Sequence, residues 1–596
     1  MARLTTFSKL LITLLIVGVI AYFLYQFAPG IKVEESRQLE SIEVTDSDVN
    51  NVTDAAQIPL PGEARSQKVA SQPLARIAAY AWNAQSGIIA ANGGPFTTEG
   101  SVMESNNVNL EIIRQDWLSE LRNLQMKFIQ EFDAGKAHPE EGVFAIMMMG
   151  DGAPYYISSV QQAIDDKYGP GKYHVQVIGA VGLSYGEDKL IGPPKWKLDP
   201  QSMRGALIST VIGDGDWVTS VNYAFANGIP VNPDPSTYDP NAVNFYPSAN
   251  DDYIESAKEL IKSQREGWTI PLKEIVDGKL TGNTINKAID GCATWTPGDK
   301  MVFDALTGFT DIVSTKEFNN QMATTLIAVK EWCERNPAMV SNILKSSFTS
   351  SNQLKLYDSW RQRAAEAVTA TYQMEDAAYW KAMFQGQKGE KGGISYNMGG
   401  SRVFNLADAR QYYGLTDGVN RYQAVYDQVS YYLKELNPAG FNQNVKRIVP
   451  YAEAVNLSFL SNVKDIDAGA AYTTDYTQKA RSVLASGEWK INFASGRATL
   501  APGAKDVLDQ IYNLLIQAED AKLEMVGHTD SEGDADANFV LSQSRAEAVK
   551  TYMIQRGIPA NRFQKVEGKG ETEPVADNAT ATGRAQNRRV VINLLN

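Results

Sequence analysis

The chain has 596 residues, of which 43% are hydrophobic and 21% charged, and its formal net charge at pH 7 is −13. This composition is that of globular domains rather than of a disordered protein, and the length exceeds what one hydrophobic core organises, so we expect several domains. The negative charge excludes nucleic acid as the expected partner, because binding to phosphate backbones draws on Lys and Arg. Three histidines and two cysteines, far apart in sequence, argue against a structural zinc site.

The first apolar segment, Leu10 to Phe27, has eighteen uncharged residues, about the length that crosses the hydrocarbon core of a membrane as a helix. Arg3 and Lys9 precede it and mainly acidic residues follow it, which orients residues 1–9 to the cytoplasm. Aromatic residues at its end suit a membrane interface better than a peptidase site. We predict a single-pass inner-membrane anchor at 10–27 with the bulk of the chain in the periplasm, and a cleaved signal peptide is the alternative.

Residues 28–72 are polar and acidic, contain several prolines and show little apolar periodicity. Such a segment cannot bury enough apolar surface to fold by itself. It is predicted to be a flexible acidic linker.

The residue pattern changes near Leu74. From there, short apolar runs bounded by glycine-rich turns alternate with segments of helical periodicity. This alternation predicts parallel strands buried between helices, arranged as two α/β lobes over residues 73–440. The glycine-rich stretch 386–393 lacks the spacing of a phosphate-binding loop and is predicted to be an exposed loop. The strand candidates are 76–82, 142–149, 173–181, 205–212 and 287–295, and the helix candidates are 109–131, 251–263 and 316–334.

Three of these segments, GAVGLSYGED (179–188), AIDGCATWTPGD (288–299) and STKEFNNQMATTLIAVKEWCERNPAMV (314–340), carry a resemblance to a known family. In this order they resemble the type 2 periplasmic solute-binding proteins, in the broad group for nitrate, sulfonates or thiamine precursors. The resemblance implies a two-lobed domain that closes on a small anionic or organic solute.

Two-lobed α/β domains bind ligands in the crevice at the carboxyl ends of their strands, so the residues directly after each strand are the cleft candidates. Indole faces can hold an organic ligand, and helix N-termini suit an anion. For every candidate, loop packing or turn chemistry is the alternative. The candidates are Trp82, Asn83, Asp151, Ser184, Asp214, Trp217 and Trp295.

The sequence offers no Walker loop and no convergent nucleophile, base and acid, so we expect neither a cofactor nor an enzymatic activity. Cys292 and Cys333 both fall in the central domain. The periplasm permits a disulfide between them, and two buried thiols are the equal alternative. Residues 441–486 mix helical and loop signals and are predicted to be a connector or a helical cover.

Four strings mark the C-terminal segment 487–596: Gly527-His528-Thr529-Asp530-Ser531, then Asn538, then LSQSRA (541–546), then Asn587-Arg588-Arg589-Val590. Together, and in this order, they resemble the OmpA-like peptidoglycan-binding domain. The segment also alternates short strands with amphipathic helices, such as 501–518 and the stretch that ends at Gly557. We expect an α/β sandwich.

The resemblance implies that Asp530 accepts the ammonium of the diaminopimelate side chain of Gram-negative peptidoglycan and that Arg545 forks onto its carboxylate. A loop-ordering carboxylate and a solvated helix arginine are the alternatives for these two residues. His528 is expected to be structural. Supporting contacts in the groove are expected from Thr529, Asn538, Asn587 and Arg588.

These parts predict an inner-membrane-anchored periplasmic protein that binds peptidoglycan non-covalently and carries a solute-binding-like domain for sensing or recruiting. The expected partners are therefore the diaminopimelate stem peptide, the inner membrane and a small solute. The alternative is the substrate-binding component of an ABC-type importer, tethered to the membrane and the cell wall.

Overall fold

The computed structural model describes residues 40–41, 56–63, 72–384, 386–436, 445–480, 482–494 and 496–596. The predicted membrane anchor at 10–27 and most of the predicted linker lie outside the described residues. Within the described part of the chain, no helix is both long and apolar enough to cross a membrane.

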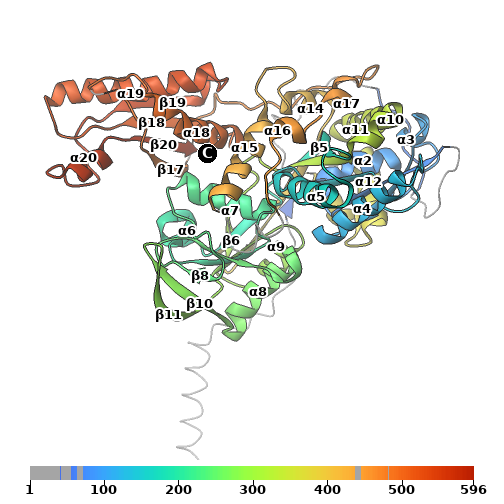
Figure 1. The fold of residues 1–596 in the computed structure, drawn as a ribbon, viewed down its shortest axis with the longest axis horizontal. Helices are drawn as coiled ribbons and strands as arrows, with labels where there is room; N and C mark the ends of the chain where they lie inside the picture. Colours follow the sequence, from blue (N-terminus) through green and yellow to red (C-terminus); the bar gives the residue numbers. More distant parts are fainter. Residues whose placement is uncertain are drawn as a thin grey trace, which may run out of the picture. The chain divides into compact units, whose positions relative to one another are not determined.

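Lobe 1, the part of Figure 1 that carries the labels β5, α2, α4 and α5, is built on one sheet. Seven of its strands follow one another in the order β3-β2-β4-β14-β5-β16-β15. β2 is parallel to β3 and β4, whereas β14 is antiparallel to both of its neighbours, β4 and β5. Every residue of β4 and β14 is buried, as expected for strands covered on both faces. The strands are β2 Leu74–Ala79, β3 Asn109–Arg114, β4 Ala145–Met149, β5 Val175–Tyr185, β14 Ala323–Val329, β15 Gln387–Lys391 and β16 Ile394–Val403.

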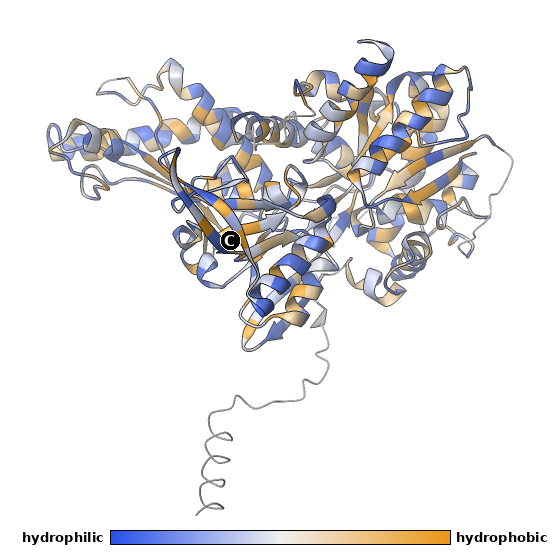
Figure 2. Ribbon diagram, turned by 60° about the horizontal axis from the view of Figure 1, so that its bottom comes forward, coloured by the Kyte–Doolittle hydropathy of each residue, from blue (hydrophilic) through white to orange (hydrophobic). Residues whose placement is uncertain are grey.

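Two groups of helices surround this sheet. In one group, α2 (Ser86–Asn92) packs against α11 (Pro337–Leu356) and α12 (Asp358–Tyr372). In the other, α4 (Leu118–Asp133) and α5 (Ala153–Tyr168) are joined by a hydrogen bond of 2.8 Å from the Tyr156 hydroxyl to Gln125. Figure 2 shows the strands of the sheet coloured mainly as apolar and the helices as mixed. The other helices are α3 Val102–Ser105, α10 Lys330–Arg335, α13 Ala377–Ala382, α14 Leu406–Tyr412 and α15 Arg421–Glu435.

Lobe 2 repeats the strand order of lobe 1 in a smaller sheet, β13-β6-β12-β7-β9. β7 is parallel to β9 and β12, and β6 is antiparallel to β12 and β13. At the same position, each lobe therefore holds a reversed strand, β14 in lobe 1 and β6 in lobe 2. The strands are β6 Lys189–Gly192, β7 Leu207–Thr210, β9 Asn244–Pro247, β12 Gly291–Thr294 and β13 Thr310–Ser314, and β8 Thr237–Tyr238, β10 Thr269–Val276 and β11 Lys279–Ala288 form a further sheet. The helices are α6 Lys195–Leu198, α7 Gly215–Ala226, α8 Tyr253–Glu266 and α9 Gly298–Ala305.

The chain crosses between the lobes twice, at residues 186–188 and at residues 315–322. The reversed strand of each lobe directly follows a crossing: β6 follows the first and β14 the second. Each lobe is therefore completed by a strand that enters from the other lobe, and the two crossings are the natural positions for a hinge.

Three predicted segments differ from the structure. Residues 109–131 form strand β3 and then helix α4, because Asn109–Arg114 completes the sheet beside β2. Residues 316–334 contain the strand β14 instead of one long helix, since a strand buried on both faces has consecutive apolar residues that mimic a helical pattern. The stretch 386–393 belongs to the β15–β16 hairpin, and its turn uses Gly392 and Gly393 at φ of 60° and 77°.

Two segments outside the predicted lobes also pack on lobe 1. Residues 56–63, within the predicted linker, lie against α11 and α12, where the Ile58 N–H donates to the Gln353 side chain at 3.0 Å. Residues 445–480 include α16 (Tyr451–Ala454) and α17 (Ser458–Ser461), and Val455 forms a bridge with Val177 of β5. This second segment therefore covers the lobe rather than only connecting domains.

The C-terminal domain has a four-stranded sheet in the order β17-β20-β18-β19. β18 is parallel to β19 and antiparallel to β20, and α19 packs on β18 and β19. The arrangement is the expected α/β sandwich, and its first strand ends at Trp489. The elements are β17 Val483–Trp489, α18 Lys505–Gln517, β18 Lys522–Gly527, α19 Ala535–Gln555, β19 Phe563–Gly568, α20 Ala581–Asn587 and β20 Val590–Leu595.

The C-terminal domain and lobe 2 share one hydrophobic core. Its buried residues come from α7 of lobe 2, from α15 and from α18 and β17 of the C-terminal domain. The rings of Phe225 and Trp489 meet edge to face with centroids 5.0 Å apart, and the Ser486 N–H donates to the Asn227 side chain at 3.2 Å. The C-terminal domain is thus packed on the central domain, so tests of its function are best made on the complete chain.

Candidate functional site

Asp530 and two arginines form the charged centre of the C-terminal domain. Asp530 follows β18, Arg545 lies in α19, and Arg588 follows α20. Arg588 donates from Nη1 to the Asp530 carboxylate at 2.5 Å, and its own side chain is 45% exposed. Asp530 and Arg588 are the groups whose charges act on Arg545, so the three side chains are neighbours. The structure brings together the residues predicted for a zwitterionic ligand.

Arg545 is largely buried, so it is not the solvated helix arginine that was the alternative interpretation. Its guanidinium lies 5.1 Å from the ring centroid of Phe493, and its Nε donates to the carbonyl of Arg497 at 3.2 Å. Burial lowers the pKa of Arg545, and the charge of Asp530 opposes this shift. Neither Phe493 nor Arg497 was predicted as part of the site. Phe493 contributes only its ring and Arg497 only its main-chain carbonyl, and neither contact has a recognisable sequence motif.

Asn538 ties the Asp530 loop to helix α19. It lies in the first turn of this helix rather than before it, and its side-chain amide donates to the carbonyls of Asp530 and Glu532 at 3.2 and 3.1 Å. The same amide donates to the Glu571 carboxylate at 2.8 Å. Asn538 therefore positions the loop, and Glu571 is a supporting residue that sequence reasoning missed.

Thr529 and His528 lie between this loop and the sheet. The Thr529 N–H donates to the carbonyl of Gly570 at 2.9 Å, and its hydroxyl oxygen is buried without a hydrogen-bond partner. Burial, followed by the charge of Arg589, lowers the pKa of His528 to about 4, so its imidazole is neutral at physiological pH. His528 is consistent with the structural role expected for it.

Asn587 acts on the loop after β19 rather than on a ligand. Its amide donates to the carbonyl of Ala576 at 2.9 Å and to the Asn578 side chain at 2.8 Å, and its oxygen accepts from the N–H groups of Val575 and Ala576 at 2.8 and 2.9 Å. These bonds use its full capacity. Asn587 is a positioning residue next to Arg588.

Two glycines allow the close approach that assembles this centre. A Cβ atom on Gly527 would lie 2.1 Å from the carbonyl oxygen of Ser542, and one on Gly568 would lie 2.3 Å from the backbone nitrogen of Gln543. Strands β18 and β19 therefore contact α19 through their backbones. This contact sets the Asp530 loop beside the helix turn that carries Arg545.

The second candidate site lies where the lobes meet. Asp151 follows β4 of lobe 1, and Asp214 is the N-cap of α7 in lobe 2. A Cβ on Gly215 would lie 2.8 Å from the Asp151 carboxylate, so this carboxylate rests against the start of α7 and only glycine fits there. Ser184 lies near the end of β5, just before the first crossing, and its hydroxyl is 2.7 Å from that of Thr315 in the second crossing.

Aromatic residues line the same region. Trp295 follows β12 and is stacked on Tyr253 with centroids 3.5 Å apart, and Tyr80 of lobe 1 meets its edge at 6.3 Å. Trp82 and Asn83 follow β2 and are also buried. Trp217 differs from the prediction, because α7 turns it toward Phe245 and Tyr432 in the core of lobe 2, at 6.2 and 6.5 Å.

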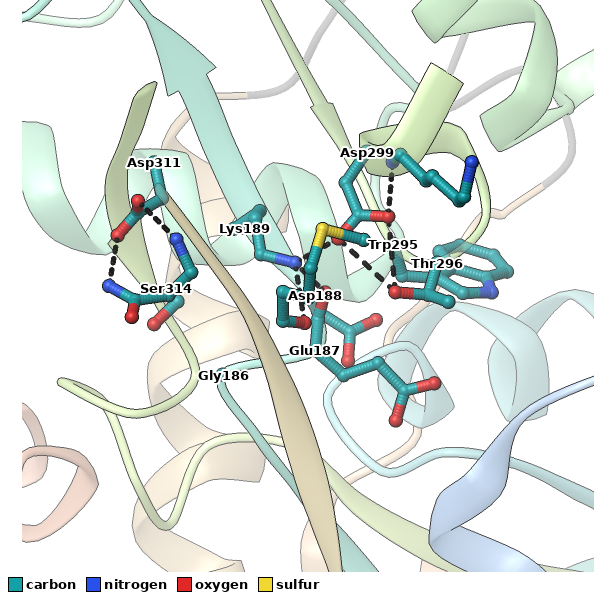
Figure 3. Close-up of polar contacts among 12 residues, drawn as sticks. Gly186, Glu187, Asp188, Lys189, Trp295, Thr296, Asp299, Asp311 and Ser314 are labelled. Carbon is teal, nitrogen blue, oxygen red and sulfur yellow. Dashed lines mark hydrogen bonds and ion pairs between the residues drawn. The ribbon is translucent and has the colours of Figure 1, made fainter. Parts of the chain in front are cut away.

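A buried ion pair of lobe 2 lies beside the first crossing (Figure 3). The Lys189 ammonium contacts the Asp299 carboxylate and donates to the carbonyls of Glu187 and Met398 at 2.6 and 3.0 Å. Thr296 donates to the same Asp299 carboxylate at 3.1 Å. Sequence reasoning missed Glu187, Lys189 and Asp299, although the charged string at 186–189 was the available signal.

The cysteines stay apart from this site and from each other. Cys292 on β12 of lobe 2 and Cys333 on α10 of lobe 1 are both buried free thiols. The structure therefore shows two buried thiols and no disulfide between these cysteines.

A hydrogen-bonded chain runs from the interlobe site to the C-terminal domain. Gln321, in the second crossing, donates to the Asp151 carboxylate at 2.8 Å and accepts from the Asn222 amide at 2.9 Å. Asn222 also donates to Gln517, near the end of α18, at 2.8 Å, and accepts from the Tyr432 hydroxyl at 2.8 Å. The polar side chains of Asp151, Gln321, Asn222 and Gln517 are all fully buried, so this chain of hydrogen bonds is shielded from water.

The second crossing and the end of β5 also contact the end of α18 and the loop after it directly. The Asn320 N–H donates to the carbonyl of Gln517 at 3.0 Å, and the Asp520 N–H donates to the Asn319 side chain at 2.9 Å. From the last residue of β5, just before the first crossing, the Tyr185 hydroxyl lies 3.4 Å from the Asp520 carboxylate. A movement of the lobes about these crossings would therefore change the contacts of the C-terminal domain.

The stability of the chain is expected to depend on pH through the interlobe carboxyls. Burial raises the pKa of Asp151 to about 7 and that of Asp214 to about 6, above the value of about 4 in unfolded chains. The folded state keeps protons that the unfolded state loses, so the free energy of unfolding falls as the pH rises from about 4 to about 7. For Asp151 the slope approaches about 1.4 kcal/mol per pH unit.

Thermal unfolding of the complete chain and of Asp151→Asn, compared from pH 5 to pH 8, measures this contribution. His528, whose folded pKa is low, has the opposite effect. Its contribution to the free energy of unfolding is lost when the pH falls below about 6.5. The informative quantity is therefore the difference between the two proteins. A difference that stays constant over this pH range would refute the assignment to Asp151.

Comparison with known proteins agrees with the C-terminal site. Residues 492–588 match the OmpA family. The probable lipoprotein YiaD of Escherichia coli is 36% identical over 118 residues, which are 20% of this chain and 53% of YiaD. The protein named peptidoglycan-binding protein ArfA of Mycobacterium tuberculosis is 37% identical over 102 residues, which are 17% of this chain and 31% of ArfA. The chain thus spans about half or less of these relatives' lengths.

Among the similar solved structures is one that aligns over a larger share of the chain. The periplasmic aliphatic sulphonate binding protein SsuA of Escherichia coli aligns with 65% of this chain and 98% of its own, at 10% identity and a TM-score of 0.37. The two-lobed architecture described above stands on the strand order of the sheets themselves.

Proposed function

We propose that this protein binds peptidoglycan non-covalently in the cell envelope through its C-terminal domain and catalyses no reaction. The observation that carries the proposal is the grouping of Asp530, Arg545 and Arg588 within an OmpA family match. The name of the relative ArfA gives the same activity.

The chemistry of the site fits the end of a diaminopimelate side chain, which carries an ammonium and a carboxylate on one carbon. Asp530 accepts the ammonium, and Arg545, held over Phe493, donates two parallel hydrogen bonds to the carboxylate. Arg588 neutralises Asp530 in the ligand-free chain and, being half exposed, can move away when the ammonium arrives.

Co-sedimentation tests this function with the complete chain and purified peptidoglycan of the diaminopimelate type. We expect the protein to pellet with the wall material and to be released by free meso-diaminopimelate. Peptidoglycan with lysine at the same position is the matched control, because its side chain ends in an ammonium without the carboxylate. Equal pelleting with both materials would contradict recognition by the Asp530–Arg545 pair.

In the wider role that we propose, residues 10–27 anchor the chain in the inner membrane, and the two-lobed domain senses a solute or recruits a partner beside the cell wall. The hydrogen-bonded chain from Asp151 through Gln321 and Asn222 to Gln517 supports a sensing role, since it joins the interlobe site to the wall-binding domain. A ligand that favours the closed lobes would shift the population of this arrangement.

A second candidate function is solute delivery to an ABC-type importer, and the shared strand order of the two lobes favours it. Growth of the producing organism on a candidate solute, with and without the gene, separates the two roles. If uptake depends on the gene, the sensing role is wrong and the membrane and wall tethers serve transport.

A further inference from the structure

Six carboxyl groups gather where the lobes meet, and one ammonium group accompanies them. Lys189 is that ammonium, and it is already committed to Asp299. Figure 3 shows the Glu187 carboxylate directed away from Lys189. The charges of Asp188, Asp214 and Asp151 all act on Asp216, which places carboxyls from both lobes in one neighbourhood. The six are Asp151, Glu187, Asp188, Asp214, Asp216 and Asp299.

Several of their oxygens are buried without a hydrogen-bond donor. Both carboxylate oxygens of Asp188, Oδ1 of Asp216 and Oε1 of Glu187 are in this state, and all three residues are at most 1% exposed. Buried carboxylates are normally paired or hydrogen-bonded, because losing water without a replacement is unfavourable. These oxygens therefore mark a place where a group with N–H donors and positive charge is stabilised.

The same arrangement disfavours an anion as the small anionic or organic solute that the sequence led us to expect. Each helix start in this region already holds a carboxylate of the chain itself: Asp151 accepts from the Gly152 N–H, Asp214 from Gly215 and Asp299 from Lys300. The positive ends of α5, α7 and α9 are thus neutralised internally. An added anion would meet six carboxyls instead of free N–H groups.

The aromatic residues indicate that the cation is organic. Trp295, stacked on Tyr253, provides a flat apolar face beside the carboxyls (Figure 3), and Trp82 is a second buried indole near the end of β2. Such faces attract organic ammonium groups. The indole Nε1 atoms of both tryptophans are buried donors without an acceptor, which suits a ligand that also carries a hydroxyl or carbonyl oxygen. Across the described ranges, no three His, Cys, Asp or Glu residues are grouped as a metal ion requires.

We propose that the interlobe site binds a small organic ammonium cation, with Asp188, Asp216 and Glu187 accepting its N–H groups and Trp82 and Trp295 enclosing its carbon body. This inference rests on the proposed ligand-responsive role of the two-lobed domain and names the ligand class for it. The ammonium replaces the protons that buried carboxyls otherwise hold, so binding strengthens as the pH rises.

Calorimetric titration of the complete chain with ethanolamine, putrescine and spermidine tests the proposal, with ethanesulfonate and nitrate as the opposing probes. We expect at least one amine to bind and neither anion to do so. The variant Asp188→Asn keeps the shape of the side chain and removes one charge. It should weaken amine binding at least about tenfold while the unfolding temperature of the ligand-free protein rises or stays unchanged at pH 8.

Glu266→Gln on the exposed end of α8 is the matched control and should bind amines as the unaltered chain does. Because Asp188→Asn is expected to fold at least as well, loss of binding cannot be assigned to unfolding. Binding of ethanesulfonate or nitrate in place of the amines would overturn the cation and leave the ligand-responsive role standing. Binding of no probe, or equal amine binding by Asp188→Asn, would overturn the inference, and neither result bears on the separate co-sedimentation test.

Discussion

Asp530→Asn and Arg545→Ala are each expected to reduce the amount of the complete chain that pellets with diaminopimelate-type peptidoglycan by at least about tenfold. Each change removes hydrogen bonds to a charged ligand group, which contribute about 1.5–3 kcal/mol, and about 1.4 kcal/mol corresponds to a tenfold change in affinity. The effect is large because Asp530 and Arg545 address opposite charges of one ligand, so the remaining partner cannot compensate.

Two further variants separate binding from folding in this experiment. Arg545→Lys keeps the charge and loses the planar fork, so it should recover only a small part of the binding. Lys550→Ala, one turn and a half along the same helix, changes a cation outside the site and should pellet normally. If Arg545→Lys pelleted normally, or if Lys550→Ala failed to pellet, net charge rather than the forked contact would hold the protein on the peptidoglycan.

The C-terminal site could be predicted because its strings are local. Asp530 follows a strand, Asn538 begins a helix and Arg545 lies two turns further on, so spacing alone sets them near one another. The ion pair from Arg588 to Asp530 spans 58 positions and depends on how β20 pairs with β18. Pairing between distant strands is decided by tertiary packing, which sequence spacing does not contain.

The interlobe site was predicted only in part. Choosing residues directly after strands found Asp151, Asp214 and Trp295, because strand ends do meet at the crevice. The same rule missed Glu187 and Asp188, which lie in a crossing between lobes, where the chain belongs to neither sheet. The list of residues that this rule missed is Glu187, Asp188, Lys189, Asp216 and Asp299.

Trp217 and β14 show two ways in which local patterns mislead. Trp217 is in the first turn of α7, but a helix presents different residues to the cleft and to the core, and this one packs on Tyr432 of α15. The apolar run at 323–329 fits a helical period as well as a buried strand, and only its pairing with β4 and β5 decides between them.

Arg421→Ala is expected to loosen the C-terminal domain from the lobes and to lower the free energy of unfolding by about 3–5 kcal/mol, because it leaves Glu519 buried without its partner. Arg421, at the start of α15, donates from Nε and Nη2 to the two carboxylate oxygens of Glu519 at 2.6 and 2.7 Å, with side chains 7% and 17% exposed. Asn320 of the second crossing donates to the same carboxylate, so the contact joins the second crossing, α15 and the C-terminal domain.

Scanning calorimetry of the complete chain measures this effect, and we expect the C-terminal domain of Arg421→Ala to unfold in a separate and earlier transition. Arg447→Ala is the matched control, because Arg447 contacts both oxygens of Glu453 at 2.6 Å while both side chains are more than half exposed. An exposed pair contributes about 0–1 kcal/mol, so this control should change little. Replacing the buried pair together, as Arg421→Met with Glu519→Leu, removes the uncompensated charge and should restore much of the stability. Equal losses for Arg421→Ala and Arg447→Ala would show that the Glu519 contact does not hold the domains together, and the interlobe site would then be joined to the C-terminal domain through the contacts of Asn222, Asn319 and Asn320.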